Sequence, residues 1–241
     1  MPRFFIDESS LCGENIIVKG GDAVHIGRSL RMKTGDMLTF CREGMEYECE
    51  IERITAEEVY CRIINSSQSS CEPDLRLTVY QALPKNDKPE LIIQKCTELG
   101  AAEFVFFISS RCVSRPDEKS AAKKLVRWQK IAEEAAKQSG RGSIPVVRGI
   151  ISLKDAVSEL AEKDMSLLCY ENGGKRLSEI DFSGVHTCGI MIGAEGGFDK
   201  TEADSVCEGG AIPVWLGERI LRCETCPIAM TAVIMNITGN F

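Results

Sequence analysis

The stretch that decides the fold is Ile192-Gly193-Ala194-Glu195-Gly196-Gly197-Phe198. It follows an apolar run, Cys188–Met191, which predicts a buried strand. Asp199 and Glu202 come next, with the Asp-x-x-Glu spacing typical of a helix start. Three glycines therefore lie on a strand-to-helix turn, where glycine permits positive φ and close approach of a ligand. In open α/β sheets, ligands bind at such turns, outside the carboxyl ends of the strands.

A second glycine-bearing turn follows at Leu216-Gly217-Glu218-Arg219-Ile220-Leu221-Arg222. It lies between a predicted strand, Ile212–Leu216, and a helix that we expect to begin at Pro227. Neither turn has a familiar phosphate-binding pattern, Gly-x-Gly-x-x-Gly or Gly-x-x-x-x-Gly-Lys-Ser/Thr. A single glycine-rich strand end is more often a tight turn than a ligand site. Two such turns close together in the chain favour a binding site.

The composition is that of an ordinary globular protein, with 241 residues of which 44% are apolar and 27% charged. This length suggests one large or two modest domains. Helical and strand patterns alternate through the second half, which predicts an α/β fold. The first seven residues lack the apolar core of a signal peptide, and no run approaches the ~18 apolar residues of a membrane span. We therefore expect a cytoplasmic protein that makes no membrane contact.

The twelve cysteines are expected to be reduced, many of them buried as small apolar residues. Only the pair in Cys223-Glu224-Thr225-Cys226 has metal-ligand or redox spacing. No second pair at zinc spacing accompanies it, and neither histidine, His25 or His186, is near it in sequence. We therefore predict no metal site and interpret these cysteines as thiols at the start of a helix.

Positive charge is concentrated in two segments, although the formal net charge is −7. The segment from His25 to Lys33 contains Arg28 and Arg31 and no acidic residue. The segment from Arg111 to Arg141 contains nine Lys or Arg residues and four acidic residues. These segments are either ordinary solvated helix surfaces or a local basic face for nucleic acid on an acidic protein. Composition alone does not separate the two.

Residues 1–72 form the first predicted domain. Short alternating or β-branched segments separated by turns indicate a small barrel or sandwich, with strands at 16–18, 37–41, 45–54 and 59–64. A short helix is expected at 23–31, with its cationic side outward. The polar segment 65–74 is predicted to be a loop or linker. A barrel this small has little room for an enzyme site, so we interpret it as a binding module.

Residues 73–241 form the second predicted domain. Its remaining strands are expected at 75–83, 103–108, 144–150 and 165–170, and its other helices at 89–99, 117–139 and 152–161. The last helix, 227–235, is apolar on nearly every side. Such a helix is typically buried all round, in the core or at a subunit interface.

Six motifs that occur in order along the whole chain carry a family resemblance. They are Met1-Pro2-Arg3-Phe4-Phe5; the pattern His25/Arg28/Leu30-Arg31/Gly35-Asp36; Lys85/Asp87/Lys88 with 95–100; 134–141; 192–198; and 216–227. Each motif is weak alone, but the ordered set resembles the bacterial 16S ribosomal RNA uridine-N3 methyltransferases of the SPOUT superfamily (the RsmE family). The chain departs from the usual family pattern at Ala194, Cys223 and Cys226, where Pro, Thr and Ala are common.

The resemblance implies an amino-terminal PUA-like β-barrel for RNA and a carboxy-terminal α/β methyltransferase domain with a parallel sheet and a deep trefoil knot. It also implies S-adenosyl-L-methionine as cofactor, a homodimer, and 16S rRNA in the small ribosomal subunit as substrate. The knot is not derivable from the residue pattern, because chains rarely thread themselves.

From these implications we expect three sets of site residues. The cofactor-binding set is Leu168, Ile192, Gly193, Glu195, Gly196, Gly197, Leu216, Gly217, Ile220 and Leu221. The catalytic set is Arg222, with Arg219 as its alternative, to stabilise a developing uridine anion, and Glu195 or Glu224 to orient a donor or take the proton. The RNA-binding set is Arg3, His25, Arg28, Arg31, Lys85, Lys88, Arg111, Arg115 and Arg141.

Two other functions compete with this interpretation. One is a non-catalytic RNA-binding protein with a degenerate knot, which calorimetry with the cofactor would separate from an enzyme. The other is a small-molecule α/β enzyme that uses the glycine-bearing turns for a nucleotide cofactor. The additional barrel and the local basic segments argue against the second.

Overall fold

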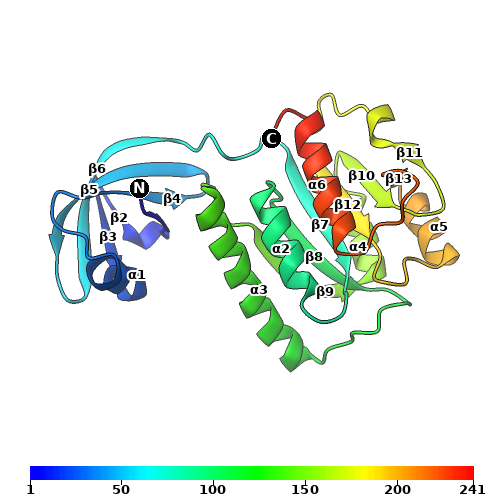
Figure 1. Cartoon of the computed structure of the whole chain (residues 1–241), viewed down its shortest axis with the longest axis horizontal. Coiled ribbons are helices and arrows are strands. Elements are labelled where there is room, and N and C mark those ends of the chain that lie inside the picture. The colour runs from blue at the N-terminus through cyan, green and yellow to red at the C-terminus, as the bar shows by residue number, and fades with distance from the viewer. The chain divides into compact units, whose positions relative to one another are not determined.

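The computed structural model describes every residue from Met1 to Phe241, and the chain separates into two compact units (Figure 1). The first unit contains Met1–Glu72 together with Ala136–Ile144. The second contains Pro73–Ala135 and Pro145–Phe241. The short segment 136–144 therefore belongs with the amino-terminal residues, which a single boundary at residue 72 does not capture.

The first unit is built on one curled six-stranded sheet (Figure 1). Its strands are β1 (Arg3–Phe5), β2 (Leu11–Cys12), β3 (Asn15–Lys19), β4 (Met37–Arg42), β5 (Met45–Ile54) and β6 (Glu58–Gln68). The spatial order is β1-β4-β5-β6-β3-β2, with β1 parallel to β4 and every other pair antiparallel. β1 and β2 are the two edges and do not pair with each other, so the sheet is not a closed barrel. The predicted linker began too early, because residues 65–68 pair with β5 as part of β6.

The predicted helix at 23–31 starts earlier than expected and changes from an α-helix to a π-helix. A five-residue α1 (Gly20–Val24) continues as a π-helical turn, His25–Ser29. Ala23 and Ile26 are buried in the core of this unit. The chain leaves the turn at Arg31, which has a left-handed φ of 55°. His25, Arg28 and Arg31 are exposed.

The second unit contains a seven-stranded sheet in which every pair is parallel. Its strands are β7 (Arg76–Ala82), β8 (Glu103–Ile108), β9 (Val146–Ser152), β10 (Met165–Cys169), β11 (Lys175–Arg176), β12 (Thr187–Ile192) and β13 (Ile212–Trp215). The spatial order is β11-β13-β10-β12-β7-β8-β9. The predicted α/β fold with a parallel sheet is confirmed. Since the strands are parallel, their carboxyl ends lie along one edge of the sheet, where the loops after β10, β12 and β13 converge.

Helices α2 (Lys88–Glu98), α3 (Glu118–Ser139), α4 (Leu153–Leu160) and α5 (Lys200–Glu208) connect strands of this sheet. Helix α6 (Thr225–Ile237) follows the last strand. The predicted start of α5 is confirmed in detail, because Asp199 caps the Glu202 N–H while the Glu202 carboxylate accepts from the Asp199 N–H. None of these helices is both long enough and apolar enough to cross a bilayer.

The last helix, α6, is only partly buried. Met230, Ile234 and Met235 are in the core of the second unit. Val233 and Ile237 are 38% and 44% exposed. Of the two predicted surroundings, the core of the single chain leaves one apolar side of this helix uncovered, and a subunit interface stays a prediction.

Candidate functional site

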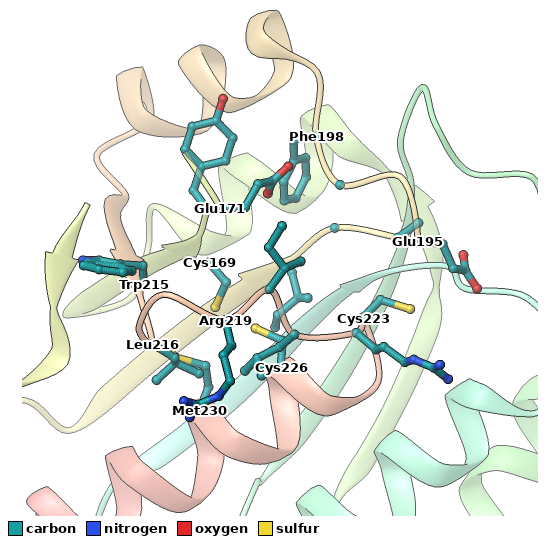
Figure 2. A pocket seen from close by; sticks show the side chains of 18 of the residues that line it. Cys169, Glu171, Glu195, Phe198, Trp215, Leu216, Arg219, Cys223, Cys226 and Met230 are labelled. Atoms are coloured by element: carbon teal, nitrogen blue, oxygen red, sulfur yellow. The ribbon is translucent and has the colours of Figure 1, made fainter. Parts of the chain in front are cut away.

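A cavity of about 590 Å³ opens at the carboxyl ends of β10, β12 and β13 (Figure 2). Two long loops form most of its wall: the loop between β12 and α5, and the loop between β13 and α6. Its lining comprises residues 169–171, 192–198 and 214–223, together with Lys88, Cys226 and Met230. Both glycine-bearing turns identified in the sequence therefore enclose one space.

The first glycine turn folds back on itself directly after β12. The Gly197 N–H donates to the Ala194 carbonyl at 2.9 Å, and Gly197 has a φ of +65°. A Cβ at Gly193 would lie 2.9 Å from backbone atoms of Gly197, closer than real contacts allow. Glycine at 193 is therefore required by the close approach of two backbone segments, and glycine at 197 by the left-handed conformation.

Gln81 holds this turn from the neighbouring strand. Gln81 pairs with Ile192 in the β7–β12 register, and its side chain is buried. The side-chain amide donates to the Gly193 carbonyl at 3.0 Å and to the Ala82 carbonyl at 2.9 Å. No sequence pattern indicated this role, because a glutamine within an apolar strand carries no signal of its partner.

The second loop is open to solvent. Gly217 has a φ of +126°, and Ile220 is 86% exposed although it contributes to the cavity wall. Arg219 and Arg222, both predicted as anion stabilisers, line the same cavity. The loop joins α6 through bonds from the Thr225 and Cys226 N–H groups to the Arg222 carbonyl, both at 2.9 Å.

A charged cluster joins the two loops to the start of α2. The ammonium of Lys88 lies 3.0 Å from Glu195 Oε1 and 3.1 Å from Glu224 Oε2. Its third contact is Cys223 Sγ, at 3.6 Å. The Cys223 thiol donates to Glu224 Oε2 at 3.2 Å, and the Lys85 N–H donates to Glu195 Oε1 at 3.1 Å. The structure thus brings both predicted carboxylates onto one lysine.

The cluster keeps its charges. Burial opposes the charge on Lys88, but its hydrogen bonds with Glu195 and Glu224 outweigh burial and raise its pKa. Burial likewise opposes ionisation of Glu195 and Glu224, yet hydrogen bonds, including those from Lys88, lower the pKa of each carboxyl. Burial first, and then the hydrogen bond to Glu224, raise the pKa of the Cys223 thiol to about 12. Cys223 therefore remains a neutral thiol between charged neighbours.

The third wall of the cavity comes from the end of β10. Cys169, Tyr170 and Glu171 line it, whereas the predicted Leu168 is fully buried in the core and is not part of the lining. Leu168 lies inside strand β10, one residue before this wall begins. The Glu171 carboxylate contacts Gly197, where a Cβ would lie 2.7 Å from Glu171 Oε1. The sequence signal for this wall was Glu171-Asn172-Gly173-Gly174, a third glycine-bearing strand end.

Thiols form part of the cavity wall as well. Cys169 and Cys226 come from β10 and α6, and Figure 2 shows their side chains between the two loops. The hydrogen bond with Cys226, and then burial, raise the pKa of Cys169. All twelve cysteines are free, and no group of three His, Cys, Asp or Glu side chains has the arrangement of a metal site.

The residues predicted to contact RNA fall into different environments. Arg3 is paired with Glu46 at 2.8 Å, and Arg141 is buried and paired with Glu72 at 2.8 Å. These two guanidinium groups are already neutralised within the protein. Lys88 belongs to the cavity, as described above. The exposed members of the set are His25, Arg28, Arg31, Lys85, Arg111 and Arg115.

Among the exposed basic residues, Arg111 contacts the wall of the cavity. Its guanidinium donates to the Gly196 carbonyl at 2.6 Å, and its side chain lies against Gly196. The adjacent Ser110 donates from its N–H to Glu202 at 2.6 Å and from its hydroxyl to Asp199 at 2.9 Å. The loop after β8 is therefore fastened to the glycine turn.

Comparisons with known proteins agree with this architecture. The RNA methyltransferase domain family matches residues 71–235. Ribosomal RNA small subunit methyltransferase E of Bacillus subtilis (strain 168) is 34% identical over 97% of this chain and 96% of its own length. The crystal structure of ribosomal RNA small subunit methyltransferase E from Neisseria gonorrhoeae bound to S-adenosyl methionine is 29% identical, has a TM-score of 0.87 and covers 98% of both chains.

A second solved structure points the same way. The putative methyltransferase Lpg2936 from Legionella pneumophila, in complex with the bound cofactor SAM, is 29% identical to this chain. It has a TM-score of 0.85 and covers 98% of this chain and 97% of its own. The similarity therefore extends through both units and is not confined to the sheet. The chain belongs to the RNA methyltransferase family that includes ribosomal RNA small subunit methyltransferase E.

Proposed function

We propose that this protein uses S-adenosyl-L-methionine to methylate N3 of a uridine in the 16S rRNA of the small ribosomal subunit, in the cytoplasm. The observation that carries the proposal is the cavity enclosed by two glycine-bearing loops at adjacent strand ends. Its supporting evidence is the similarity, over nearly the whole chain, to rRNA methyltransferases and to proteins solved with this cofactor.

The residues present fit such a methyl donor. A volume of about 590 Å³ is in the range of cavities that hold ligands of this size. Ile192, Leu216 and Leu221 offer apolar contacts for a purine. Glycine at 193 and 197 lets the turn pack tightly, since a Cβ would meet Gly197 backbone atoms at 2.9 Å or Glu171 Oε1 at 2.7 Å. Glu171 offers a carboxylate for hydroxyl or ammonium groups.

We assign the cofactor to the following residues: Ile192, Gly193, Glu195, Gly196, Gly197, Leu216, Gly217, Ile220 and Leu221 from the two loops, and Cys169, Tyr170 and Glu171 in place of Leu168. The bound donor supplies an electrophilic methyl group carried on a sulfonium. Positioning then dominates, because alignment of donor and acceptor contributes up to about 7–11 kcal/mol to such reactions. Arg219 or Arg222 stabilises negative charge on the uracil, and Glu195 or Glu224 accepts the N3 proton.

The first unit is proposed to be a PUA-like module that binds RNA through His25, Arg28 and Arg31. On the second unit, the proposed RNA contacts are Lys85, Arg111 and Arg115. Arg3 and Arg141 are left out, because their charges are paired within the protein. The proposed RNA contacts are all exposed, and all except His25 are Lys or Arg, whose charges displace counterions from phosphates.

We also propose that the second unit has the SPOUT trefoil knot and that the protein is a homodimer. The homodimer is supported by α6, whose exposed side carries Val233 and Ile237. Exposed apolar side chains on a helix that is otherwise core favour burial against a partner. Light scattering on the protein and on Val233→Glu tests this, with a dimer expected for the first and a weakened dimer for the second.

The deciding experiment is methyl transfer from tritiated S-adenosyl-L-methionine to unmodified 16S rRNA and to unmodified small subunits, followed by nucleoside analysis. The expected product is N3-methyluridine. Binding of the cofactor is measured in parallel by calorimetry. Cofactor binding without transfer to either RNA form would contradict the proposed reaction and favour a protein that binds RNA without modifying it.

A further inference from the structure

Lys88 makes three contacts that together use every N–H of its ammonium. Two acceptors are carboxylate oxygens, Glu195 Oε1 and Glu224 Oε2, at 3.0 and 3.1 Å. The third is Cys223 Sγ at 3.6 Å. Sulfur is a weak acceptor, so this third contact is the one most easily exchanged for a better one.

The exchangeable contact faces the cavity. Lys88, Glu195 and Cys223 all line it. The two carboxylates come from different loops and hold the ammonium in place. The side chain of Lys88 is 28% exposed and that of Glu224 is 14% exposed. An ammonium fixed in this way keeps its position when the sulfur contact is replaced. The cavity therefore presents a hydrogen-bond donor, the ammonium, next to an acceptor, the Glu195 carboxylate.

This donor–acceptor pair matches one edge of uracil. Next to N3–H, a donor, uracil carries a carbonyl oxygen, an acceptor, on either side. Cytosine has an unprotonated N3, which would face the Glu195 carboxylate with a lone pair. Enzymes that modify bases read them by hydrogen bonds to this edge, and a site that leaves a buried polar group unpaired discriminates strongly.

We propose, on the basis of the function proposed above, that Lys88 is a catalytic and uracil-selecting residue and not a phosphate contact. Its third N–H leaves Cys223 Sγ and donates to a uracil carbonyl oxygen. Glu195 accepts the N3 proton as the N3–methyl bond forms and the sulfur–methyl bond breaks, so that the sulfonium becomes a neutral thioether. The ammonium stabilises the negative charge that develops on the carbonyl oxygen. Glu224 holds Lys88 in position.

The net formal charge of the cluster supports transfer of the N3 proton to Glu195. Glu195, Glu224 and Lys88 sum to one negative charge, which a proton neutralises. The groups that face Lys88 are Glu195, Glu224 and Cys223, and Arg219 and Arg222 line the same cavity. Since Lys88 stays charged throughout, its role is electrostatic and the proton goes to a carboxylate.

The test compares Lys88→Met, Lys88→Arg and a matched loss of charge, Lys154→Met, in single-turnover methyl transfer between pH 6 and 9. Lys154 is an exposed residue of α4 outside the cavity lining. Lys88→Met is expected to reduce the rate by roughly 10²–10³-fold, as removal of one charge-stabilising donor does. Lys88→Arg is expected to lose about tenfold, and Lys154→Met to match the parent. Cofactor affinity by calorimetry should stay within about threefold for all three.

Two readouts separate catalysis from a structural role. Without Lys88, the negative charge on the uracil is no longer stabilised, so the rate of Lys88→Met should depend more on prior ionisation of N3 and rise more steeply with pH than the rate of the parent. RNA with 5-fluorouridine at the target, whose N3–H is more acidic, should accelerate Lys88→Met much more than the parent. A slow Lys88→Met whose pH profile and fluorouridine response parallel those of the parent would overturn the proposal, as would one with the parental rate.

If Lys88→Met does not fold, the same two readouts on Lys88→Arg decide the matter, because a bulkier cation shifts the uracil contact while keeping both ion pairs. Product formation by the parent tests the proposed function separately from the role of Lys88. A parent that forms no N3-methyluridine would overturn the proposed function and this inference with it. If the parent forms N3-methyluridine and Lys88→Met forms it at the parental rate, only the role of Lys88 is overturned.

Discussion

The side-chain amide of Gln81 donates a 3.0 Å hydrogen bond to the carbonyl of Gly193, and so one strand controls the glycine turn that follows its neighbour. The donor and the acceptor are 112 residues apart in the chain. Adjacent parallel strands bring them together, since Gln81 pairs with Ile192 in the register of β7 and β12. The turn is therefore held in position by the sheet itself.

Replacement of this glutamine is expected to loosen the turn. Gln81→Leu leaves the Gly193 carbonyl without its buried donor, at a cost of about 1–3 kcal/mol. We expect a lower thermal midpoint and roughly tenfold weaker binding of S-adenosyl-L-methionine by calorimetry. Gln94→Leu, an exposed change on α2, is the control and should leave both unchanged. Equal cofactor affinity for Gln81→Leu and the parent would show that the turn does not depend on this bond.

The close approach of Gly193 to Gly197 predicts a steric effect. In Gly193→Ala the new Cβ meets backbone atoms 2.9 Å away, which cannot rotate aside as a flexible side chain can. The turn has to open, and cofactor binding should fall by more than tenfold. Gly21→Ala is the matched control, because a Cβ there meets nothing within 4 Å. The measurement is the dissociation constant of the cofactor for both variants.

Glu72 and Arg141 form a partly buried ion pair within the first unit, in which the Arg141 side chain is buried and the Glu72 side chain is 20% exposed. The Glu72 carboxylate accepts from the Arg141 guanidinium at 2.8 and 3.2 Å, and from the Gly142 and Ser143 N–H groups. Glu72→Ala removes these hydrogen bonds from the buried Arg141 guanidinium, so the free energy of unfolding should fall by about 1–3 kcal/mol. Glu14→Ala, an exposed change in the same unit, should alter it by less than about 0.5 kcal/mol. Urea denaturation measures both, and a similar loss for the two would contradict a partly buried pair.

The exposed arginines of the first unit predict a salt effect on RNA binding. Arg28→Gln with Arg31→Gln should reduce the slope of log affinity against log salt by about 0.7–0.9 for each phosphate that the double variant no longer neutralises. Arg62→Gln is the control, since Arg62 is paired with Glu50 at 2.7 Å and Glu52 at 3.3 Å. Binding of an rRNA fragment is measured between about 50 and 200 mM salt. An unchanged slope in the double variant would remove both arginines from the proposed RNA surface.

Cys223 should resist alkylation despite its place in the cavity wall. Thiolate is the reactive form, and a pKa of about 12 leaves roughly one thiol in ten thousand ionised at pH 8. Iodoacetamide followed by mass spectrometry should therefore modify the exposed Cys12 and Cys71 well before Cys223.

The neighbours of the Cys223 thiol determine how its alkylation rate responds to substitution and to pH. Since Glu224 helps to raise the pKa of Cys223, Glu224→Gln should lower that pKa and speed alkylation of Cys223 at a given pH. In the parent, the rate should keep rising through pH 9. A rate for Cys223 that equals that of Cys12 at pH 8 would contradict the buried, neutral thiol seen here.

Much of the local structure was predictable from the sequence. The start of α5 at Asp199, the strand at Glu103–Ile108 and the start of α4 next to Ser152 occur where short-range patterns indicated them. Those patterns involve residues within one turn or one strand, so the chain itself contains the whole signal. Both glycine-bearing turns were found for the same reason, because glycine is required locally by backbone conformation and close contact.

What the sequence by itself determined is therefore the order of the longer strands and helices and the two turns that wall the cavity. Only the tertiary structure decided which side chains meet there. It placed Lys88 between two carboxylates, paired Arg141 with Glu72, and left one side of α6 exposed. The physical reason is that sheet order sets these contacts. β7, β10, β12 and β13 are dispersed along the chain but adjacent in space, and no local pattern encodes which strand ends meet.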